Sequence, residues 1–261
     1  MKALLVAGEK SYLNEISYLL KDDQFRKSTK NMLLCYHSIN KIIAKIPFRI
    51  YETFDCNEIG LFIGTSHGEL ETTKDFLKSI GIDKRARPFL FQHGLHNATL
   101  GFICQTLNHT GPAITVSNRF FSGEDAIDLA MDWLQLNKIK IAITVGYDSL
   151  PLGLENQVRG LYPQSTQLST GSAAALVLAN EEGVRKILNT NYSINLNNLF
   201  LERITYCRTS NARTGGSTST HYYDSNAIEE IYNNLSRYPN HCSTMNLQKP
   251  NGTYSVINMA S

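Results

Sequence analysis

The stretch GPAITVSNRFFSG, residues 111–123, decides the fold, because it joins a strand to a helix through a short turn. Residues 113–118 are rich in β-branched side chains, which favour a strand. Apolar side chains at helical spacing predict a helix over 124–136, and the branched residues of 139–145 predict a second strand. Strand, turn, helix and strand in this order are typical of a βαβ unit in a parallel sheet.

Apolar periodicity on both sides of this unit predicts further elements of the same kind. Residues 208–226 are dominated by Ser, Thr, Gly and Asn and are expected to form a surface loop. No internal repeat or linker is visible, so we expect a single α/β domain. The expected strands are 3–7, 59–64, 172–179, 199–207 and 254–259, and the expected helices are 27–45, 70–80, 95–107 and 227–235.

Composition narrows the class of protein. The chain has 261 residues, of which 42% are hydrophobic and 18% charged, so a large core is expected and disorder is not. A net charge of +2 is too small to indicate nucleic-acid binding. The five cysteines form no CxxC pair, and no stretch predicts a signal peptide or a membrane span. We therefore expect a cytoplasmic protein that needs no cofactor or metal.

The order of elements and the residues in their turns resemble the β-ketoacyl synthases. The resemblance extends over roughly residues 25–210 and implies a layered fold of the thiolase type, with parallel and mixed sheets around central helices. It further implies a reduced C-terminal half, with about 1–185 as the N-terminal half of a single domain, 1–261, and about 186–261 as the shortened remainder. The motifs that carry it are IGLFIGT (59–65), NATLG (97–101), the stretch 111–123, Asp125-Ala126, VGYD (145–148) and STGSAAALVL (169–178).

One departure from the family decides the expected function. Counted from the Gly-Pro pair, Phe120 occupies the position at which active members carry a nucleophilic cysteine. The N-terminus of a helix stabilises a thiolate, which attacks an acyl thioester while a backbone N–H of the turn binds the oxyanion. Phenylalanine has no nucleophilic atom, so no acyl transfer is expected there. The chain also ends about fifty residues after the start of the Ser/Thr/Gly loop, and neither His221 nor His241 has the family's His-Gly-Thr setting.

A ketosynthase-like chain without its nucleophile resembles the chain-length factors of type II polyketide systems, and its short form resembles the truncated partner of aryl-polyene clusters. The implied partner is an active β-ketoacyl synthase, which in this family pairs through the strand ending near residue 118 and shares its acyl tunnel. An acyl carrier protein is implied as an indirect partner, and nucleic acid and membrane are not. The implied tunnel or interface residues are His67, Leu90, Phe91, Gly94, Asn118, Arg119 and Phe121.

Two other functions stay open. The chain is an independent acyltransferase or thioesterase if Cys104, Ser122 or a loop histidine supplies a relocated nucleophile, or an acyl-binding protein if only the pocket remains. Ser122 fits a helix N-cap better than a nucleophile, and Cys104 is expected to be an inert core thiol. Arg119 is either exposed or paired with Asp125, Asp148 or a partner subunit. The spacing of His93, His96, Cys104 and His109 is common by chance and does not predict a metal site.

Overall fold

The computed structural model describes residues 3–151, 153–154, 171–190, 200–207, 218–220, 243–248 and 254–260. Its strands form one sheet in the order β3-β2-β4-β5-β1-β6-β9-β8-β7. β2 pairs in parallel with both β3 and β4, and β5 runs antiparallel to β4 and β1. The strands are β1 Ala3–Tyr12, β2 Ile59–Gly64, β3 Ala113–Val116, β4 Ile141–Ser149, β5 Gly171–Ala179, β6 Phe200–Cys207, β7 Thr218–Thr220, β8 Ser243–Gln248 and β9 Tyr254–Ala260.

The helices cover the sheet and extend beyond it. None of those in the described ranges is long and apolar enough to cross a membrane. The helices are α1 Lys30–Lys45, α2 Ile50–Thr53, α3 Leu70–Gly81, α4 Pro88–His93, α5 Ala98–Thr106, α6 Ser122–Gln135 and α8 Glu181–Leu188.

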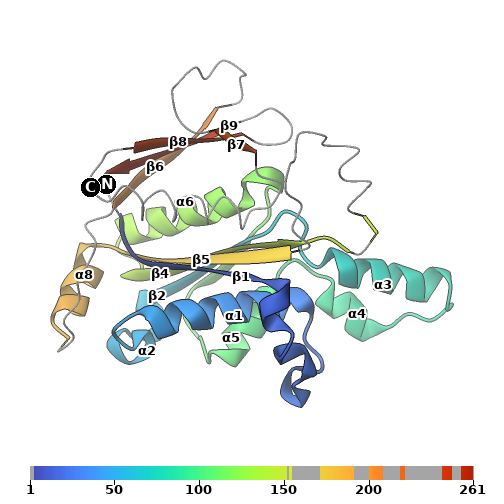
Figure 1. Cartoon of the computed structure of the whole chain (residues 1–261). Coiled ribbons are helices and arrows are strands. Elements are labelled where there is room, and N and C mark those ends of the chain that lie inside the picture. The colour runs from blue at the N-terminus through green and yellow to red at the C-terminus, as the bar shows by residue number, and fades with distance from the viewer. Residues whose placement is uncertain are drawn as a thin grey trace.

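The sheet folds over α6 and so produces a layered molecule. β1 pairs with β5 along most of its length but meets β6 only through Ala3 and Leu4. Beyond this junction, β6, β9, β8 and β7 lie on the other side of α6, as Figure 1 shows. α1 and α5 cover the opposite face of the first five strands (Figure 1). The expected layered α/β fold with a central helix is confirmed.

Strands β2, β4 and β5 are buried on both faces, which explains their nearly continuous apolar sequences. Leu61 and Ile63 pack in the cluster beneath α1 and α5, whereas Phe62 between them packs against α6. On α6, Ile127 and Leu134 belong to the apolar stripe that fills this second cluster. The central helix is therefore held by side chains from the middle of the parallel strands.

Several expected elements need correction. The first strand continues to Tyr12, since its polar residue Glu9 forms an ion pair with Lys45 of α1 at 2.8 Å instead of ending the strand. The expected βαβ unit is present with one strand inserted: β3 and β4 both run parallel to β2, which lies between them. The stretch 208–226 contains the short strand β7, and the expected helix 227–235 lies outside the described residues.

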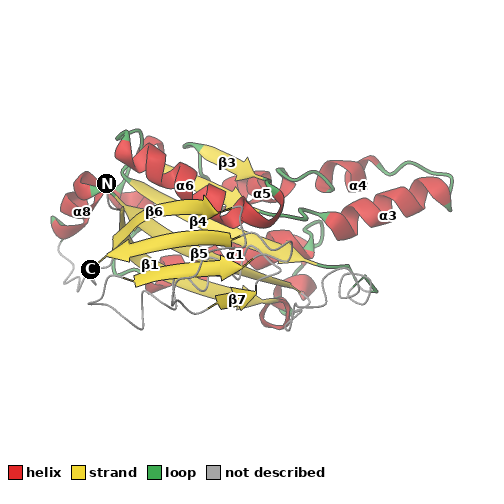
Figure 2. Cartoon of the chain, turned by 90° about the horizontal axis from the view of Figure 1, so that it is seen from above, coloured by secondary structure: helices red, strands yellow, loops and turns green. Residues whose placement is uncertain are grey.

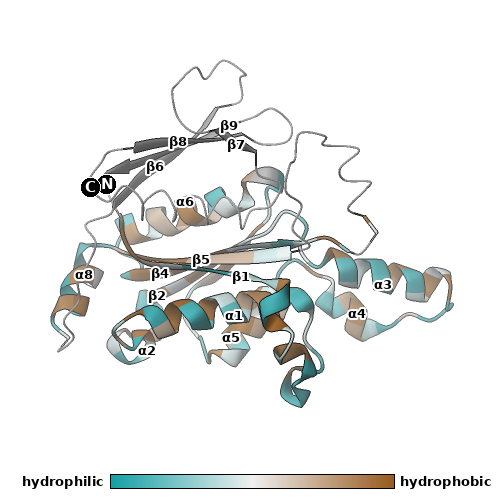
Figure 3. Ribbon diagram, viewed as in Figure 1, coloured by the Kyte–Doolittle hydropathy of each residue, from teal (hydrophilic) through white to brown (hydrophobic). Residues whose placement is uncertain are grey.

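Helices α3 and α4 form an arm that projects from the body, seen most clearly from above in Figure 2. The two helices hold each other through the tilted rings of Phe76 and Phe91, whose centroids are 5.4 Å apart. The Thr73 hydroxyl also donates to the carbonyl of Gly94 at 3.2 Å. Brown apolar and teal polar segments alternate along the arm in Figure 3. Its exposed apolar side chains are Leu77, Ile80, Ile82, Phe89, Phe91 and the adjoining Leu95.

Candidate functional site

The candidate site lies where the parallel strands end. The loop 65–68 follows β2, the turn 117–121 follows β3, and Asp148 lies near the end of β4. Because carboxyl ends of parallel strands meet at one edge of a sheet, these segments converge at the N-terminus of α6. The contact is close: a Cβ atom on Gly64 would overlap the carbonyl of Ser122. Glycine at this position therefore allows the tip of α6 to touch β2.

Asp148 organises the loop 65–68 and is itself fully buried. One of its oxygens accepts hydrogen bonds from the Thr65 hydroxyl at 2.9 Å and from the backbone N–H of His67 at 2.8 Å. Its other oxygen accepts from the backbone N–H of Ser66 at 3.1 Å. Hydrogen bonds donated to a buried carboxylate are strong and offset the cost of removing its negative charge from water. The loop conformation is thus set by a residue more than eighty positions later in the chain.

The His67 ring completes this arrangement. Its Nδ1 lies 3.2 Å from the Asp148 carboxylate. Burial by itself lowers the pKa of the imidazole, but the hydrogen bond and the negative charge of Asp148 outweigh burial, so the pKa of His67 is raised above 6.5. The Asp148 carboxylate therefore orients the His67 ring at the end of β2 and favours its protonated form.

The turn before α6 is fixed by two serine hydroxyls. Ser122 Oγ donates to the carbonyl of Arg119 at 2.8 Å and accepts from the backbone N–H of Asn118 at 2.8 Å. Ser66 Oγ donates to the same Arg119 carbonyl and joins the two loops. Arg119 adopts a positive φ of 51°. Its side chain is exposed in this chain, and its pairing with a partner subunit stays a prediction.

Ser122 is not the N-cap that the sequence predicts. Phe121 occupies the cap position, and Ser122 is the first residue of α6. Its hydroxyl is buried and bonded within the turn, with no base among its partners there. This environment does not favour a nucleophilic serine.

The structure brings five of the eight candidate residues close together and separates the other three. His67, Asn118, Arg119, Phe120 and Phe121 all belong to the two loops at the strand ends. The backbone of Phe120 lies in the short 3-10 helix of residues 119–121 that leads directly into α6. Asn118 donates its side-chain amide to Asp125 at 2.6 Å. Leu90, Phe91 and Gly94 lie on the projecting arm, where Phe91 is 53% exposed.

Three of the cysteines have described side chains, and none lies at the tip of α6. Cys104, expected to be an inert core thiol, packs against the core on the face of the sheet opposite α6 and is half-buried. Burial raises the pKa of both Cys35 and Cys104, which disfavours the reactive thiolate. Cys56 precedes β2, at the opposite end of that strand. Within the described ranges, His, Cys, Asp and Glu side chains form no group suited to a metal ion.

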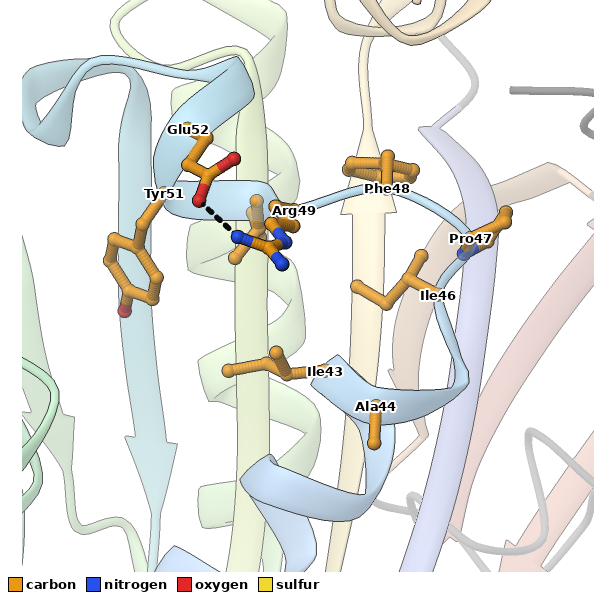
Figure 4. Close-up of a pocket in the computed structure, with 9 residues that line it drawn as sticks. Ile43, Ala44, Ile46, Pro47, Phe48, Arg49, Tyr51 and Glu52 are labelled. Atoms are coloured by element: carbon orange, nitrogen blue, oxygen red, sulfur yellow. Dashed lines mark hydrogen bonds and ion pairs between the residues drawn. The ribbon is translucent and has the colours of Figure 1, made fainter. Parts of the chain in front are cut away.

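An apolar hollow of about 430 Å³ lies elsewhere, at the C-terminal end of α1 (Figure 4). Arg49 and Glu52 form an ion pair at 2.7 Å beside it. The hollow adjoins the segment that leads into β2, so it is not part of the candidate site. It is lined by Ile43, Ala44, Ile46, Pro47, Phe48, Arg49, Ile50, Tyr51 and Glu52.

Two acidic residues of the site region were missed as site residues from sequence. Asp148 was considered only as a partner of Arg119, and Glu69 was not singled out. Both follow short motifs at strand ends, Val-Gly-Tyr before Asp148 and Ser-His-Gly before Glu69. An acidic residue one or two positions after a glycine, within five residues of the end of an expected strand, was the available signal.

Comparisons with known proteins agree with this geometry. Residues 49–176 match the model of the β-ketoacyl synthase N-terminal domain. A stretch of 103 residues is 28% identical to the fatty acid synthase alpha subunit hexA of Dothistroma septosporum; the match covers 39% of this chain and 6% of that protein. The chain is therefore β-ketoacyl synthase-like in sequence.

Solved structures share the fold at low identity. A type II polyketide synthase acyl-carrier protein complex with its hexaketide-bound ketosynthase contains a chain with a TM-score of 0.72 and 12% identity, covering 100% of this chain and 99% of that one. The Xenorhabdus doucetiae ketosynthase in complex with its chain length factor gives 0.62 and 11%, with both chains covered completely. The ishigamide ketosynthase/chain length factor gives 0.66 and 12%, over 94% of this chain and 84% of that one. The fold is that of the ketosynthases.

Asp148 provides a test of the site's construction. Asp148→Ala removes the acceptor of one buried and two partly buried donors, so we expect a loss of about 3–5 kcal/mol in the free energy of unfolding, measured by urea denaturation. Asp148→Asn keeps one oxygen and is expected to lose less. The Asp148 carboxylate raises the pKa of His67, so the ion pair between them also contributes to stability. This contribution is present below pH 6.5 and is lost as the pH rises through the raised pKa of His67. An Asp148→Ala protein as stable as wild type would contradict this account.

Proposed function

We propose that the chain is a non-catalytic, chain-length-factor-like partner of an active β-ketoacyl synthase in polyketide or fatty-acid-type biosynthesis. The observation that carries the proposal is Phe120 in the turn before α6, at the position that corresponds to the family's nucleophile. The hydroxyl nearest to this turn in the sequence, that of Ser122, is already bonded within it. Supporting evidence comes from the fold shared with chains from ketosynthase and chain length factor complexes.

Strand β3 supplies the surface for pairing. Among the described strands it bonds only to β2, which leaves its other edge open. An open edge is a template for a strand of another chain. Its four residues are only half-buried, unlike those of β2 and β4. In the proposed complex, this edge pairs with the corresponding strand of the ketosynthase.

The arm of α3 and α4 extends the same interface. Its exposed side chains, among them Phe91 and Ile82, are large and apolar, as at the centre of obligate interfaces. We assign Leu90, Phe91 and Gly94 on the arm to the part that reaches the partner's acyl tunnel, and His67 to the wall of the pocket. The chain acts as one domain, 1–261, whose reduced part after about residue 185 supplies the remaining sheet.

A relocated nucleophile is the alternative function, and no observation favours it. Cys104 lies on the opposite face of the sheet from α6, and burial raises the pKa of its thiol. Thiol labelling with an acyl-thioester analogue separates the two functions. Labelling that disappears in Cys104→Ala would support the independent enzyme.

Co-expression with the ketosynthase encoded nearest to this chain tests the proposal. We expect the two chains to co-purify as a stable complex, with product formed only when both are present. A ketosynthase that never co-purifies with this chain and makes the same product alone would refute the proposed function.

A further inference from the structure

A second carboxyl group, separate from the Asp148 pair, lies at the root of the arm. Glu69 is 2% exposed and directly precedes α3. Three threonine hydroxyls donate to its carboxyl group, one from each of three helix starts. Thr29 precedes α1 and donates at 3.0 Å, Thr99 is the second residue of α5 and donates at 2.5 Å, and Thr72 lies in the first turn of α3 and donates at 3.4 Å. One side chain thus joins the beginnings of three helices.

Glu69 also lines a hollow of about 330 Å³ between the body and the arm. Phe89 and Leu90 of α4 form its arm side, and Ser149 of β4 lies on its body side. The backbone of Glu69 accepts the N–H of Thr73 at 2.9 Å, so the first turn of α3 starts from this residue. A change at Glu69 therefore acts on the point where the arm is attached.

Two opposing effects act on the pKa of Glu69. Burial raises the pKa of the carboxyl to about 7, against the lowering effect of the three threonine hydroxyls. Its surroundings contain charges of both signs. Facing it are Lys30 and the thiol of Cys35 on α1, Glu71 and Asp75 on α3, Tyr147 and Asp148 on β4, Arg26 and Lys27 before α1, and, against the neighbouring Gly68, the ring of His96.

We propose that Glu69 is a proton-controlled latch for the α3–α4 arm. With a proton bound, the carboxyl is buried without a charge, its O–H donates to one threonine hydroxyl while the other threonines still donate to it, and the root of the arm stays against α1 and α5. On ionisation, the buried charge draws water into the hollow and loosens the root. The consequence for assembly rests on the proposed function: a partner that binds the closed arm selects the state that holds this proton, so binding takes up a proton and strengthens as pH falls.

The sign follows from linkage. The folded state binds this proton more tightly than the open state, whose carboxyl has an ordinary pKa. The stabilisation is full below that ordinary value and is lost as pH rises through about 7. Between pH 6 and pH 8.5 the opening equilibrium of the arm root should increase about tenfold.

Hydrogen exchange of the full chain measures this opening directly. We expect protection of residues 70–95, corrected for the intrinsic effect of pH, to fall about tenfold between pH 6 and 8.5 in the wild type. Glu69→Gln should abolish this dependence, and the matched control Glu181→Gln, on the exposed first turn of α8 and away from the arm (Figure 1), should retain it. Protection of the wild type that does not change with pH, or an unchanged slope in Glu69→Gln, would overturn the latch.

Binding to the ketosynthase at the same two pH values separates this inference from the proposed function. Tighter binding at pH 6, made independent of pH by Glu69→Gln, supports both. Exchange that follows the prediction without binding at either pH supports the latch and refutes the proposed function. Binding that is equal at both pH values in the wild type refutes the link between the latch and assembly.

Discussion

Replacement of Thr115 by proline is expected to separate this chain from its ketosynthase while leaving it folded. Leu61 N–H donates to the carbonyl of Pro112 at 2.9 Å, and Thr65 N–H donates to that of Val116 at 3.1 Å. Because alternate residues of a strand bond to the same neighbour, the N–H of Thr115 points to the open edge of β3. Proline there removes an edge donor without breaking the bonds to β2.

The expected effect is at least a hundredfold weaker complex, equivalent to about 3 kcal/mol, measured by titration of the purified chains. Thr115→Val is the matched control, because it keeps the N–H and a β-branched side chain. The Thr115 hydroxyl is buried without a hydrogen-bond partner among the described residues, so its loss is tolerated. Equal binding by the proline and valine variants would show that the edge of β3 is not the interface.

Replacement of Gly64 by alanine is expected to cost more stability than any other single methyl group added at the site. The new Cβ atom would overlap the backbone carbonyl of Ser122 and lie 2.8 Å from the Cα of Gly123. Both are backbone atoms at the start of α6, so neither moves without shifting the helix. Overpacking of this kind costs about 1–3 kcal/mol, and more where backbone must move, so we expect a loss above 3 kcal/mol.

Gly101→Ala provides the comparison. Gly101 lies within α5, and a Cβ there would have no atom within 4 Å. Alanine favours a helix over glycine by about 1 kcal/mol, so this variant should be more stable than wild type. Urea denaturation of both variants measures the difference. A Gly64→Ala protein as stable as Gly101→Ala would contradict the close contact between β2 and α6.

Local patterns predicted the central strands and helices because their side chains are apolar on each face that is buried in the fold. Residues 59–64 form β2 with the expected bounds, and α6 begins two residues before the expected helix and ends one residue before it. The first strand was predicted too short because Glu9 and Lys10 interrupt its apolar run. Glu9 forms an ion pair with Lys45 of α1, and the ammonium group of Lys10 lies over the ring of Tyr12 in the same strand. Hydrophobic periodicity predicts neither contact.

The site was harder to predict than the core. The family resemblance placed Phe120 and its neighbours at the tip of α6, and local sequence contributed little more. Asp148 binds loop residues 81 to 83 positions away, and Glu69 bonds to Thr29 forty positions earlier. No short-range pattern encodes such contacts. Ser122 was misassigned as a cap because its hydroxyl bonds backward into the turn, a competing local pattern for serine.

The most direct test of the central claim is the intact mass of each chain after the complex reacts with an acyl-thioester substrate. The account predicts an acyl adduct on the ketosynthase alone, with the mass of this chain unchanged, and no adduct on either chain when the ketosynthase nucleophile is replaced. An acyl adduct on this chain that persists after that replacement would contradict it.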